Sequence, residues 1–381
     1  MDLKPTAQHE AFRGEVRDWL AANKPALPLP SGDTIDGAPA HLAWERKLYN
    51  ARLAVVSWPQ RFGGRDLDLW HWLIFEEEYY RAGLPQRVAQ NGIFLLAPSL
   101  LEFGTNDQQE RFLRRIASVA DIWCQGWSEP DAGSDLASLR SRALRDEKGG
   151  GWRLEGQKCW TTRAAISTHM FGIFRTGELA QRHHGLTYFL IDLDQPSVTV
   201  QPVNKFDGTE GFADVYFDGA FVADSDVLGG VGNGWQVAMA TTGSERSLTL
   251  RSPGRFLATA DRLIEQFRAA PETVRADARH RAAVADAWMG AQAYKLATDW
   301  AVTRLLDGVP LGAEASLSKL FWSELDIELH QAGLVLQGSD ADLDDHWIKG
   351  FQFALSGPIY AGTNEIQRNI VAERLLGIPR R

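Results

Sequence analysis

The hydrophobic pattern of this chain changes its period twice, and these two changes narrow the choice of fold more than any other feature. Up to about Ala117 the apolar residues recur at helical spacing. From about Ile122 to Val227 they fall in short runs of period two, bounded by Gly, Pro, Asp and Asn, which predicts an antiparallel β domain. After Gly234 the helical pattern returns. The pattern predicts an α+β multidomain protein with an N-terminal α-helical domain (1–120), a middle β domain (121–228) and a C-terminal α-helical bundle (229–381).

Short signals predict where individual helices begin and end. Gly104 stops one helix, and Thr105 with Gln108 three residues later forms a capping box for the next. Proline residues punctuate the C-terminal part and leave long helices near 274–306 and 313–336. The C-terminal part is therefore expected to be a bundle of long helices.

Charge and cysteine content exclude several functional classes. The 381 residues carry a formal net charge of −9 without a Lys/Arg run, so we expect no nucleic-acid partner. No stretch approaches the ~20 apolar residues of a membrane helix, and the N-terminus is polar, which predicts a cytoplasmic protein with no membrane partner. Cys124 and Cys159 are expected to be buried free thiols, with a disulfide as the alternative. Neither these cysteines nor His183 and His184, which are adjacent to each other, have further possible metal ligands nearby in the sequence. We therefore expect no metal site.

The stretch from Trp123 to Asp135 joins a strand-like half to a polar turn that begins at Glu129. Its proline fixes φ and its glycine permits backbone conformations closed to other residues, so a strand is expected to end in a stiff loop. Such a loop presents N–H groups and the hydroxyls of Ser128 and Ser134 beside the flat ring of Trp127, which suits a planar cofactor. On composition alone, a surface turn between two strands explains the stretch equally well.

Three motifs in this order resemble those of the acyl-CoA dehydrogenase family. Residues 128–135, Ser-Glu-Pro-Asp-Ala-Gly-Ser-Asp, are similar to the family's Ser/Thr-Glu-Pro-x-Ala-Gly-Ser-Asp loop. Residues 156–162, Gly-Gln-Lys-Cys-Trp-Thr-Thr, resemble Asn-Gly-x-Lys-x-Trp-Ile-Thr. Residues 359–368, Ile-Tyr-Ala-Gly-Thr-Asn-Glu-Ile-Gln-Arg, resemble Ile-Tyr-Glu-Gly-Thr-x-x-Ile-Gln-Arg. The resemblance therefore covers almost the whole chain.

The resemblance implies a fold, a cofactor and a reaction. Family members are flavoproteins that remove two hydrogens from Cα and Cβ of acyl thioesters, and their middle domain is an antiparallel β-barrel. This chain is thereby expected to bind FAD, to convert an acyl-CoA to the trans-2-enoyl-CoA, and to pass electrons to an electron-transfer flavoprotein or a similar acceptor. The implied cofactor contacts are Gln125, Trp127, Ser128, Gly133, Ser134, Trp160, Thr161, Thr162, Gly338, Thr363 and Glu365, and the implied substrate contacts are Ser134, Arg246 and Ala361.

The catalytic base is where this chain departs from the commoner family pattern. In many members the residue between Tyr and Gly of the C-terminal motif is the catalytic glutamate, but here it is Ala361, whose methyl group takes no proton. A subset that includes the isovaleryl- and long-chain-type enzymes carries its glutamate on the first helix of the C-terminal domain, directly before an arginine. Glu245 and Arg246 match that arrangement, so the resemblance assigns proton abstraction to Glu245. Without the resemblance, a Glu-Arg pair on a helix is typical of a solvated face.

Two family motifs that hold FAD from a neighbouring subunit are altered. The diphosphate clamp Arg-x-x-Phe-Gly is replaced by residues 266–271, Gln-Phe-Arg-Ala-Ala-Pro, and the Gln-x-x-Gly-Gly pattern by Leu334, Gln337 and Gly338. By resemblance to the heterotetrameric acyl-CoA dehydrogenases of sterol side-chain breakdown, a paralogous subunit is expected to supply the clamp. A homotetramer is the alternative.

Two other functions remain open at this point. The first alternative is a non-catalytic or half-site subunit of a heteromeric acyl-CoA dehydrogenase. The second is an acyl-CoA oxidase that passes electrons to oxygen. Bleaching of bound flavin by an acyl-CoA distinguishes an enzyme from a non-catalytic subunit, and stoichiometric peroxide identifies an oxidase. The position of the base and the small residues around it favour a bulky or branched acyl group.

Overall fold

The computed structural model describes residues 5–206, 208–246, 252–309, 311–338 and 346–379. The chain divides into two units, each of which combines segments that are distant in sequence. We call them the helical unit (Met1–Leu27, Leu67–Pro85 and Glu245–Arg381) and the sheet unit (Pro28–Asp66 and Gln86–Ser244), and each is described by itself.

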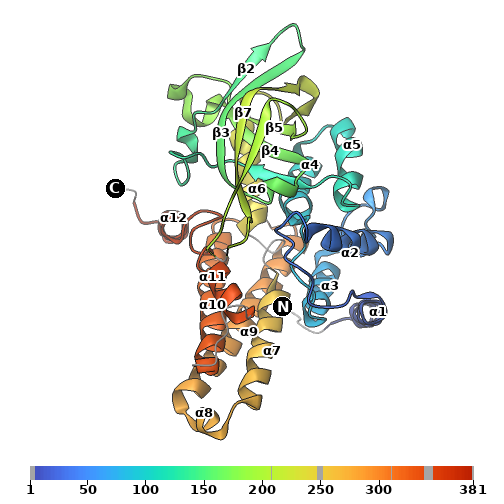
Figure 1. The fold of residues 1–381 in the computed structure, drawn as a ribbon, viewed down its shortest axis with the longest axis vertical. Helices are drawn as coiled ribbons and strands as arrows, with labels where there is room; N and C mark the ends of the chain where they lie inside the picture. The colour runs from blue at the N-terminus through green and yellow to red at the C-terminus, as the bar shows by residue number, and fades with distance from the viewer. Residues whose placement is uncertain (1–4, 207, 247–251, 310, 339–345, 380–381) are drawn as a thin grey trace. The chain divides into compact units, whose positions relative to one another are not determined.

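The sheet unit is organised around one eight-stranded sheet whose path runs β6-β7-β3-β2-β4-β5-β8, with β1 beside β4. Strands β2, β3, β4, β5 and β7 of this sheet are labelled in Figure 1. Most ladders are antiparallel, as the period-two pattern predicts. The β1–β4 ladder and a single β2–β4 pair are parallel, which the sequence did not indicate, because the pattern of the whole region favours an antiparallel sheet without fixing the direction of each strand. The strands are β1 (Trp123–Gly126), β2 (Arg142–Asp146), β3 (Gly151–Thr162), β4 (His169–Arg175), β5 (Leu186–Asp192), β6 (Val198–Val203), β7 (Phe212–Ala223) and β8 (Val227–Leu228).

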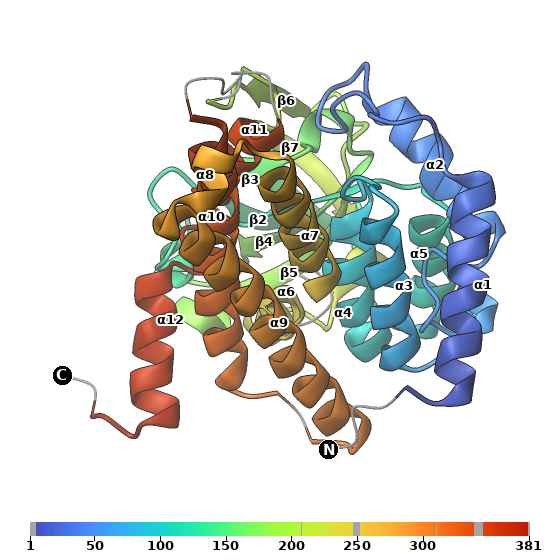
Figure 2. The ribbon, with the colours of Figure 1, turned by 90° about the horizontal axis from the view of Figure 1, so that it is seen from below.

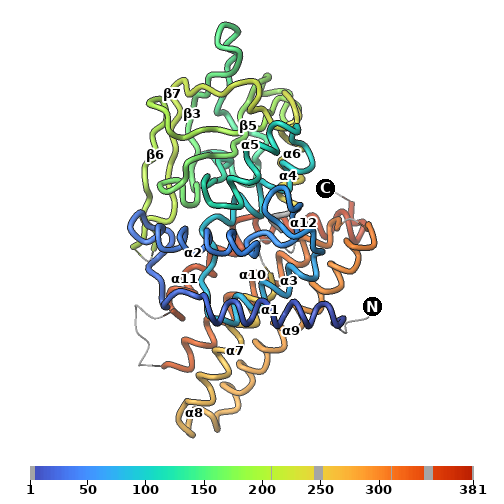
Figure 3. The backbone as a smooth tube through the Cα atoms, turned by 90° about the vertical axis from the view of Figure 1, so that its right-hand side faces the viewer, coloured from blue at the N-terminus to red at the C-terminus, as the bar shows by residue number. Residues whose placement is uncertain are grey.

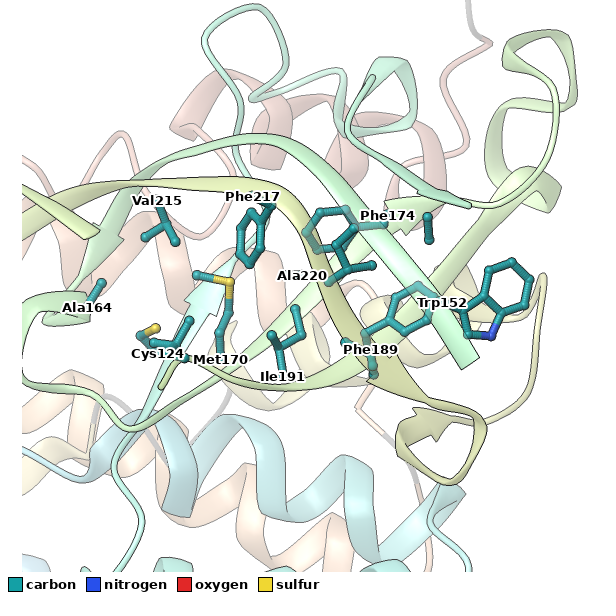
Figure 4. Close-up of a cluster of buried hydrophobic side chains, with 14 of the residues drawn as sticks. Cys124, Trp152, Ala164, Met170, Phe174, Phe189, Ile191, Val215, Phe217 and Ala220 are labelled. Atoms are coloured by element: carbon teal, nitrogen blue, oxygen red, sulfur yellow. The ribbon is translucent and has the colours of Figure 1, made fainter. Parts of the chain in front are cut away.

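Apolar side chains from strands far apart in the sequence form the core of the sheet unit. Figure 4 shows Met170 between Cys124 and Phe217, with Phe174 and Phe189 farther along the same cluster. Cys124 and Cys159 are both buried and free, which confirms the prediction of unpaired thiols. Burial raises the pKa of Cys124 to about 12, so this thiol stays protonated and inert.

Short helices complete the sheet unit. Thr105 and Gln108 form the predicted capping box, each side chain accepting a hydrogen bond from the other residue's backbone N–H, and Gly104 ends the preceding helix. The α-helices are α2 (Ala38–Asn50), α4 (Ala97–Phe103), α5 (Asn106–Ala117) and α6 (Gly234–Arg246), whose last two residues are assigned to the helical unit. A π-helix (η2, Asn91–Leu96) precedes α4, and short 3₁₀ turns are η1 (Gln60–Phe62), η3 (Leu136–Ser138), η4 (Ala164–Ile166), η5 (Leu179–Gly185) and η6 (Asp224–Asp226).

The helical unit contains α1 (Ala7–Asn23), α3 (Leu69–Arg81), α7 (Pro253–Ala269), α8 (Glu272–Ala276), α9 (Ala278–Leu306), α10 (Glu314–Gln337), α11 (His346–Ala354), α12 (Asn364–Ile370) and the π-helical turn η8 (Val371–Leu375). Helix α3 packs between α1 and α7, and α7 packs on α9 and α10 (Figure 2). Helices α7 and α9 run side by side to the short α8 that joins them (Figure 3).

One predicted helix boundary is wrong. The helix expected from residue 274 begins at Ala278 instead, and residues 272–276 form the separate α8. Asp277 breaks the pattern because its backbone is extended (ψ 120°) and its carboxylate caps the N–H of Arg279. None of the helices among the described residues combines the length and apolarity that crossing a lipid bilayer requires.

Candidate active site

The loop that follows β1 begins at a close approach between two strands. Gly126 ends β1, and a Cβ atom at this position would overlap the sulfur of Met170 on β4. Glycine is therefore needed for the strands to pair at this point. Gln125 is partly buried, and the Trp127 side chain is buried with only 7% exposed, its ring meeting Tyr188 edge to face at 6.3 Å.

The predicted turn is present and is tied to β3. The N–H of Glu129 donates to the carbonyl of Ala132 (2.9 Å), and the N–H of Ala132 donates back to Glu129 (3.1 Å). The carbonyl of Ser128 accepts the N–H of Cys159 on β3 (2.9 Å). Gly133 and Ser134 are exposed farther along the loop. These bonds hold the first and second motifs against each other.

A buried ion pair fixes the same loop from the inside. Lys158, which is 0% exposed, donates from Nζ to Glu129 Oε1 at 2.7 Å and to the carbonyl of Trp127 at 3.4 Å. Glu129 also accepts the N–H groups of Arg140 (2.6 Å) and Ser141 (3.0 Å). Burial opposes the charge on Glu129, but Lys158 and these N–H donors hold its pKa below the ordinary value. The Glu129 carboxylate is therefore ionised, and both of its oxygens accept hydrogen bonds.

Trp160 has the strained backbone of this site. Its φ is +56°, in the left-handed region that a bulky residue rarely adopts, and it lies where the β3–β7 register shifts between Lys158 and Thr161. The bulge turns its ring outward, so the side chain is 67% exposed, with Phe212 at 5.9 Å. Thr161 is buried and Thr162 partly buried. The exposed flat aromatic surface of this site is thus Trp160, whereas Trp127 packs in the core.

The C-terminal motif forms a second pre-shaped loop, in the helical unit. Ala361 has φ +57° and Gly362 has φ +80°, so two successive residues take left-handed backbone. The Gln367 side chain donates to the carbonyls of both, at 3.1 and 3.2 Å. Thr363 is the N-cap of α12 and accepts the N–H of Ile366. Glu365 follows in the first turn and is exposed.

The start of α12 is bonded to α10 through buried side chains. Asn364 Oδ1 accepts from Lys319 Nζ at 2.7 Å and from Ser323 at 3.1 Å. The Tyr360 ring lies 5.8 Å from Trp322 at a tilt of 32°. The loop that contains Ala361 is therefore anchored on both sides.

The proposed base is placed only by its backbone. Glu245 and Arg246 are the last two residues of α6, and their side chains lie outside the described residues. Gly338 is the C-cap of α10, with φ +57°. Gly338, Ala361, Thr363 and Glu365 belong to the helical unit, whereas all predicted contacts between Gln125 and Thr162 belong to the sheet unit.

Sequence reasoning missed the buried charges that shape the loops. Lys158 was visible inside the second motif, but its inward position appears only once the β3 register is known. Arg175, at the end of β4, donates to the carbonyls of Ala137 and Leu139 at 2.8 and 3.0 Å and so supports the far end of the same loop. No local sequence signal marked it.

One group of three possible metal ligands occurs among the described residues: His9, Asp68 and His71, with ligand atoms within 4.8 Å of one another. Asp68 is the N-cap of α3 and accepts both the N–H (3.1 Å) and the ring nitrogen Nδ1 (2.6 Å) of His71. Helix capping accounts for this arrangement, and we assign it no metal.

Comparison with known proteins identifies the family. Three protein-family profiles match: "Acyl-CoA dehydrogenase, N-terminal domain" at residues 6–120, "Acyl-CoA dehydrogenase, middle domain" at 124–220 and "Acyl-CoA dehydrogenase, C-terminal domain" at 232–376. The chain is 39% identical over 390 aligned positions to the acyl-CoA dehydrogenase IpdE1 of Mycobacterium tuberculosis, covering 97% of this chain and 98% of that protein.

Solved structures share the fold. The Tcur3481-Tcur3483 steroid ACAD superposes with a TM-score of 0.87 at 24% identity, covering 100% of both chains. The ChsE4-ChsE5 complex from Mycobacterium tuberculosis gives 0.84 at 24% identity, also covering 100% of both. With its helical N-terminal part, middle sheet and C-terminal helices, this chain belongs to the acyl-CoA dehydrogenase family of oxidoreductases.

Proposed function

We propose that this chain is an FAD-dependent acyl-CoA dehydrogenase that converts an acyl-CoA thioester to the trans-2-enoyl-CoA, with Glu245 as the base. The observation that carries the proposal is the rigid loop pair of the sheet unit, in which Glu129 and Lys158 lock the first motif and Trp160 presents an exposed ring from the second. A planar cofactor requires such a preformed wall.

Buried polar atoms beside this wall fit a flavin. Trp127 Nε1 and Thr161 Oγ1 are buried and have no hydrogen-bond partner among the described residues. An unpaired buried polar atom costs about 1–3 kcal/mol, so such atoms are expected where a ligand contributes the missing partner. Gln125, Ser128, Gly133, Ser134 and Thr162 would complete the cofactor contacts in this unit, and Gly338, Thr363 and Glu365 those in the helical unit.

The chemistry divides between the cofactor and the chain. FAD, when bound, supplies the acceptor for the hydride that leaves Cβ. Glu245 would take the proton from Cα, and Ala361, whose backbone Gln367 holds in its left-handed conformation, would donate its N–H to the thioester carbonyl as negative charge develops there. Arg246 and Ser134 would position the acyl-CoA.

A heteromeric assembly is the second part of the proposal. The segment that replaces the diphosphate clamp is used internally, because the Gln266 amide donates to the carbonyl of Gly333 on α10 at 3.1 Å. Helix α9 exposes an apolar row of three large side chains, Trp288, Leu296 and Trp300, which are 41%, 49% and 42% exposed. We propose that a paralogous subunit covers this row and supplies the clamp, as two different chains assemble in the ChsE4-ChsE5 complex.

One experiment separates the functions. Purified protein, alone and co-expressed with the nearest encoded paralogue, is titrated anaerobically with straight-chain, branched and steroid-derived acyl-CoA thioesters while flavin absorbance is recorded. Bleaching by one class supports a dehydrogenase and names its substrate. Colourless protein that becomes yellow only with the paralogue supports a half-site subunit, and stoichiometric peroxide without another acceptor supports an oxidase. Yellow protein that no acyl-CoA bleaches would overturn the proposal.

A further inference from the structure

Three charged side chains are buried together behind the first and second motifs. Glu129 and Lys158 form the ion pair described above, and Arg175, which is 4% exposed, lies close enough for its charge to interact with the charges of both. Arg175 donates to four backbone carbonyls, those of Ala137 and Leu139 and those of Glu178 and Arg182, at 2.8 to 3.3 Å. Among the described residues no carboxylate lies within ion-pair distance of it. This group, which we call the buried charge cluster, therefore contains two cations and one carboxylate.

The geometry fixes the cluster in place. The Nζ of Lys158 also lies 4.6 Å from the centre of the Phe174 ring, and Glu129 is held by two backbone N–H groups. Burial lowers the pKa of Lys158, while Glu129 opposes this by favouring the ammonium form. The side chains cannot reorient toward water, and their field is screened less than that of surface charges.

The cluster is continuous in sequence with the proposed flavin contacts. Trp127 and Ser128 immediately precede Glu129, and Trp160 follows Lys158 by two residues. Hydride transfer adds two electrons and one proton to a flavin, so the ring gains one negative charge. A fixed positive potential at the ring stabilises the reduced form relative to the oxidised form.

We infer that the surplus positive charge of the buried charge cluster raises the reduction potential of the flavin, with Lys158 and Arg175 acting in the opposite direction to Glu129. The inference rests on the proposed function, since it needs bound FAD. Lys158, Arg175 and Glu129 are positioning and electrostatic residues in this scheme.

A purely structural role and an electrostatic role of the ion pair predict different signs for the changes in the flavin's reduction potential. If the ion pair only stiffened the loop, removing either partner would disturb the flavin in the same direction. With a field effect, Lys158→Met lowers the potential and Glu129→Gln raises it. The double variant Lys158→Met/Glu129→Gln removes one positive and one negative charge, so the net charge of the cluster is unchanged. Its reduction potential is expected to stay near that of the unmodified enzyme. For a two-electron couple, a tenfold change in the relative stability of the two flavin forms corresponds to about 30 mV, which titration resolves.

The experiment measures the midpoint potential of the FAD-loaded holoenzyme, together with FAD content and the thermal midpoint. Arg153→Met is the matched control, because Arg153 lies on the same strand β3 but is exposed, pairing with Asp146 at 2.9 Å. Opposite shifts for the two single variants, with the control unchanged, support the inference. If either single variant does not fold, the double variant is compared with Arg175→Met instead. Arg175→Met is expected to lower the midpoint potential, whereas the double variant is expected to leave it nearly unchanged.

Shifts of equal sign in Lys158→Met and Glu129→Gln, or no shift in either, overturn the inference and leave the proposed function intact. Unmodified protein that takes up no FAD, alone or with its paralogue, instead refutes the proposed function itself.

Discussion

The side-chain amide of Gln367 donates a hydrogen bond to the backbone carbonyl of Ala361 at 3.1 Å, from a position that is completely buried. It bonds Gly362 in the same way at 3.2 Å. One side chain thus holds both left-handed residues of the C-terminal motif, the segment proposed to bind the thioester carbonyl.

Gln367→Leu removes both donors at nearly constant volume. We expect a loss of about 1–3 kcal/mol in the free energy of unfolding, because the carbonyls of two partly buried residues lose the Gln367 donor. We also expect a lower kcat/KM at unchanged FAD content. Urea denaturation and steady-state kinetics measure the two effects. Asn369→Leu, at an exposed position of the same helix α12, is the control, and equal losses in both variants would contradict the role given to Gln367.

Glu245→Gln tests the base. The amide keeps the shape of the side chain but accepts no proton, so turnover should fall by orders of magnitude while FAD content and thermal midpoint persist. Glu265→Gln, an exposed glutamate on α7, should leave turnover unchanged. Near-normal turnover of Glu245→Gln under saturating acyl-CoA would move the base to another residue.

Acid stability should depend on Asp33. Its carboxylate pairs with Arg163 at 2.7 Å and Lys205 at 2.8 Å, next to the second motif. Burial opposes its charge, but the two cations lower the pKa of Asp33 from 3.8 to about 2. Since the pKa of Asp33 is lower in the folded than in the unfolded state, its two ion pairs stabilise the folded protein above about pH 4. This contribution, about 2 kcal/mol, is lost as the pH falls toward 2.

Asp33→Asn lacks this titration. Its unfolding free energy should be lower than that of the unmodified protein at pH 6, and the difference should shrink as the pH falls from 4 to 2. Chemical denaturation at several pH values measures this. A difference independent of pH would show that the carboxylate contributes by packing alone.

Gly254 permits the contact between α7 and α3. A Cβ at this position would lie 2.7 Å from the carbonyl oxygen of Glu76 and 2.9 Å from Cα of Glu77, both on rigid backbone. Gly254→Ala should therefore destabilise the protein by about 1–3 kcal/mol. Gly14→Ala is the matched control in helix α1, where a Cβ meets nothing within 4 Å, and it should stabilise by about 0.5–1 kcal/mol. Thermal unfolding of Gly254→Ala and Gly14→Ala measures whether each substitution lowers or raises the stability as expected.

Local pattern was sufficient for much of this protein. The changes of hydrophobic period located the sheet and the helices, and the Thr105–Gln108 capping box and the Glu129 turn appear where the residues predicted them. These features depend on bonds between residues only a few positions apart. The helix start near 274 was wrong because Asp277, read as a helical residue, caps α9 instead.

The folded chain alone settled the remaining features. The parallel β1–β4 ladder, the outward turn of Trp160 at its bulge and the burial of Lys158 against Glu129, 29 residues away, depend on how strands register in the sheet. Alternating hydrophobicity over a region does not fix the direction of each single strand and cannot indicate which buried lysine meets which glutamate. Those choices follow from long-range packing, in which each buried charge needs either an opposite charge or hydrogen-bond partners.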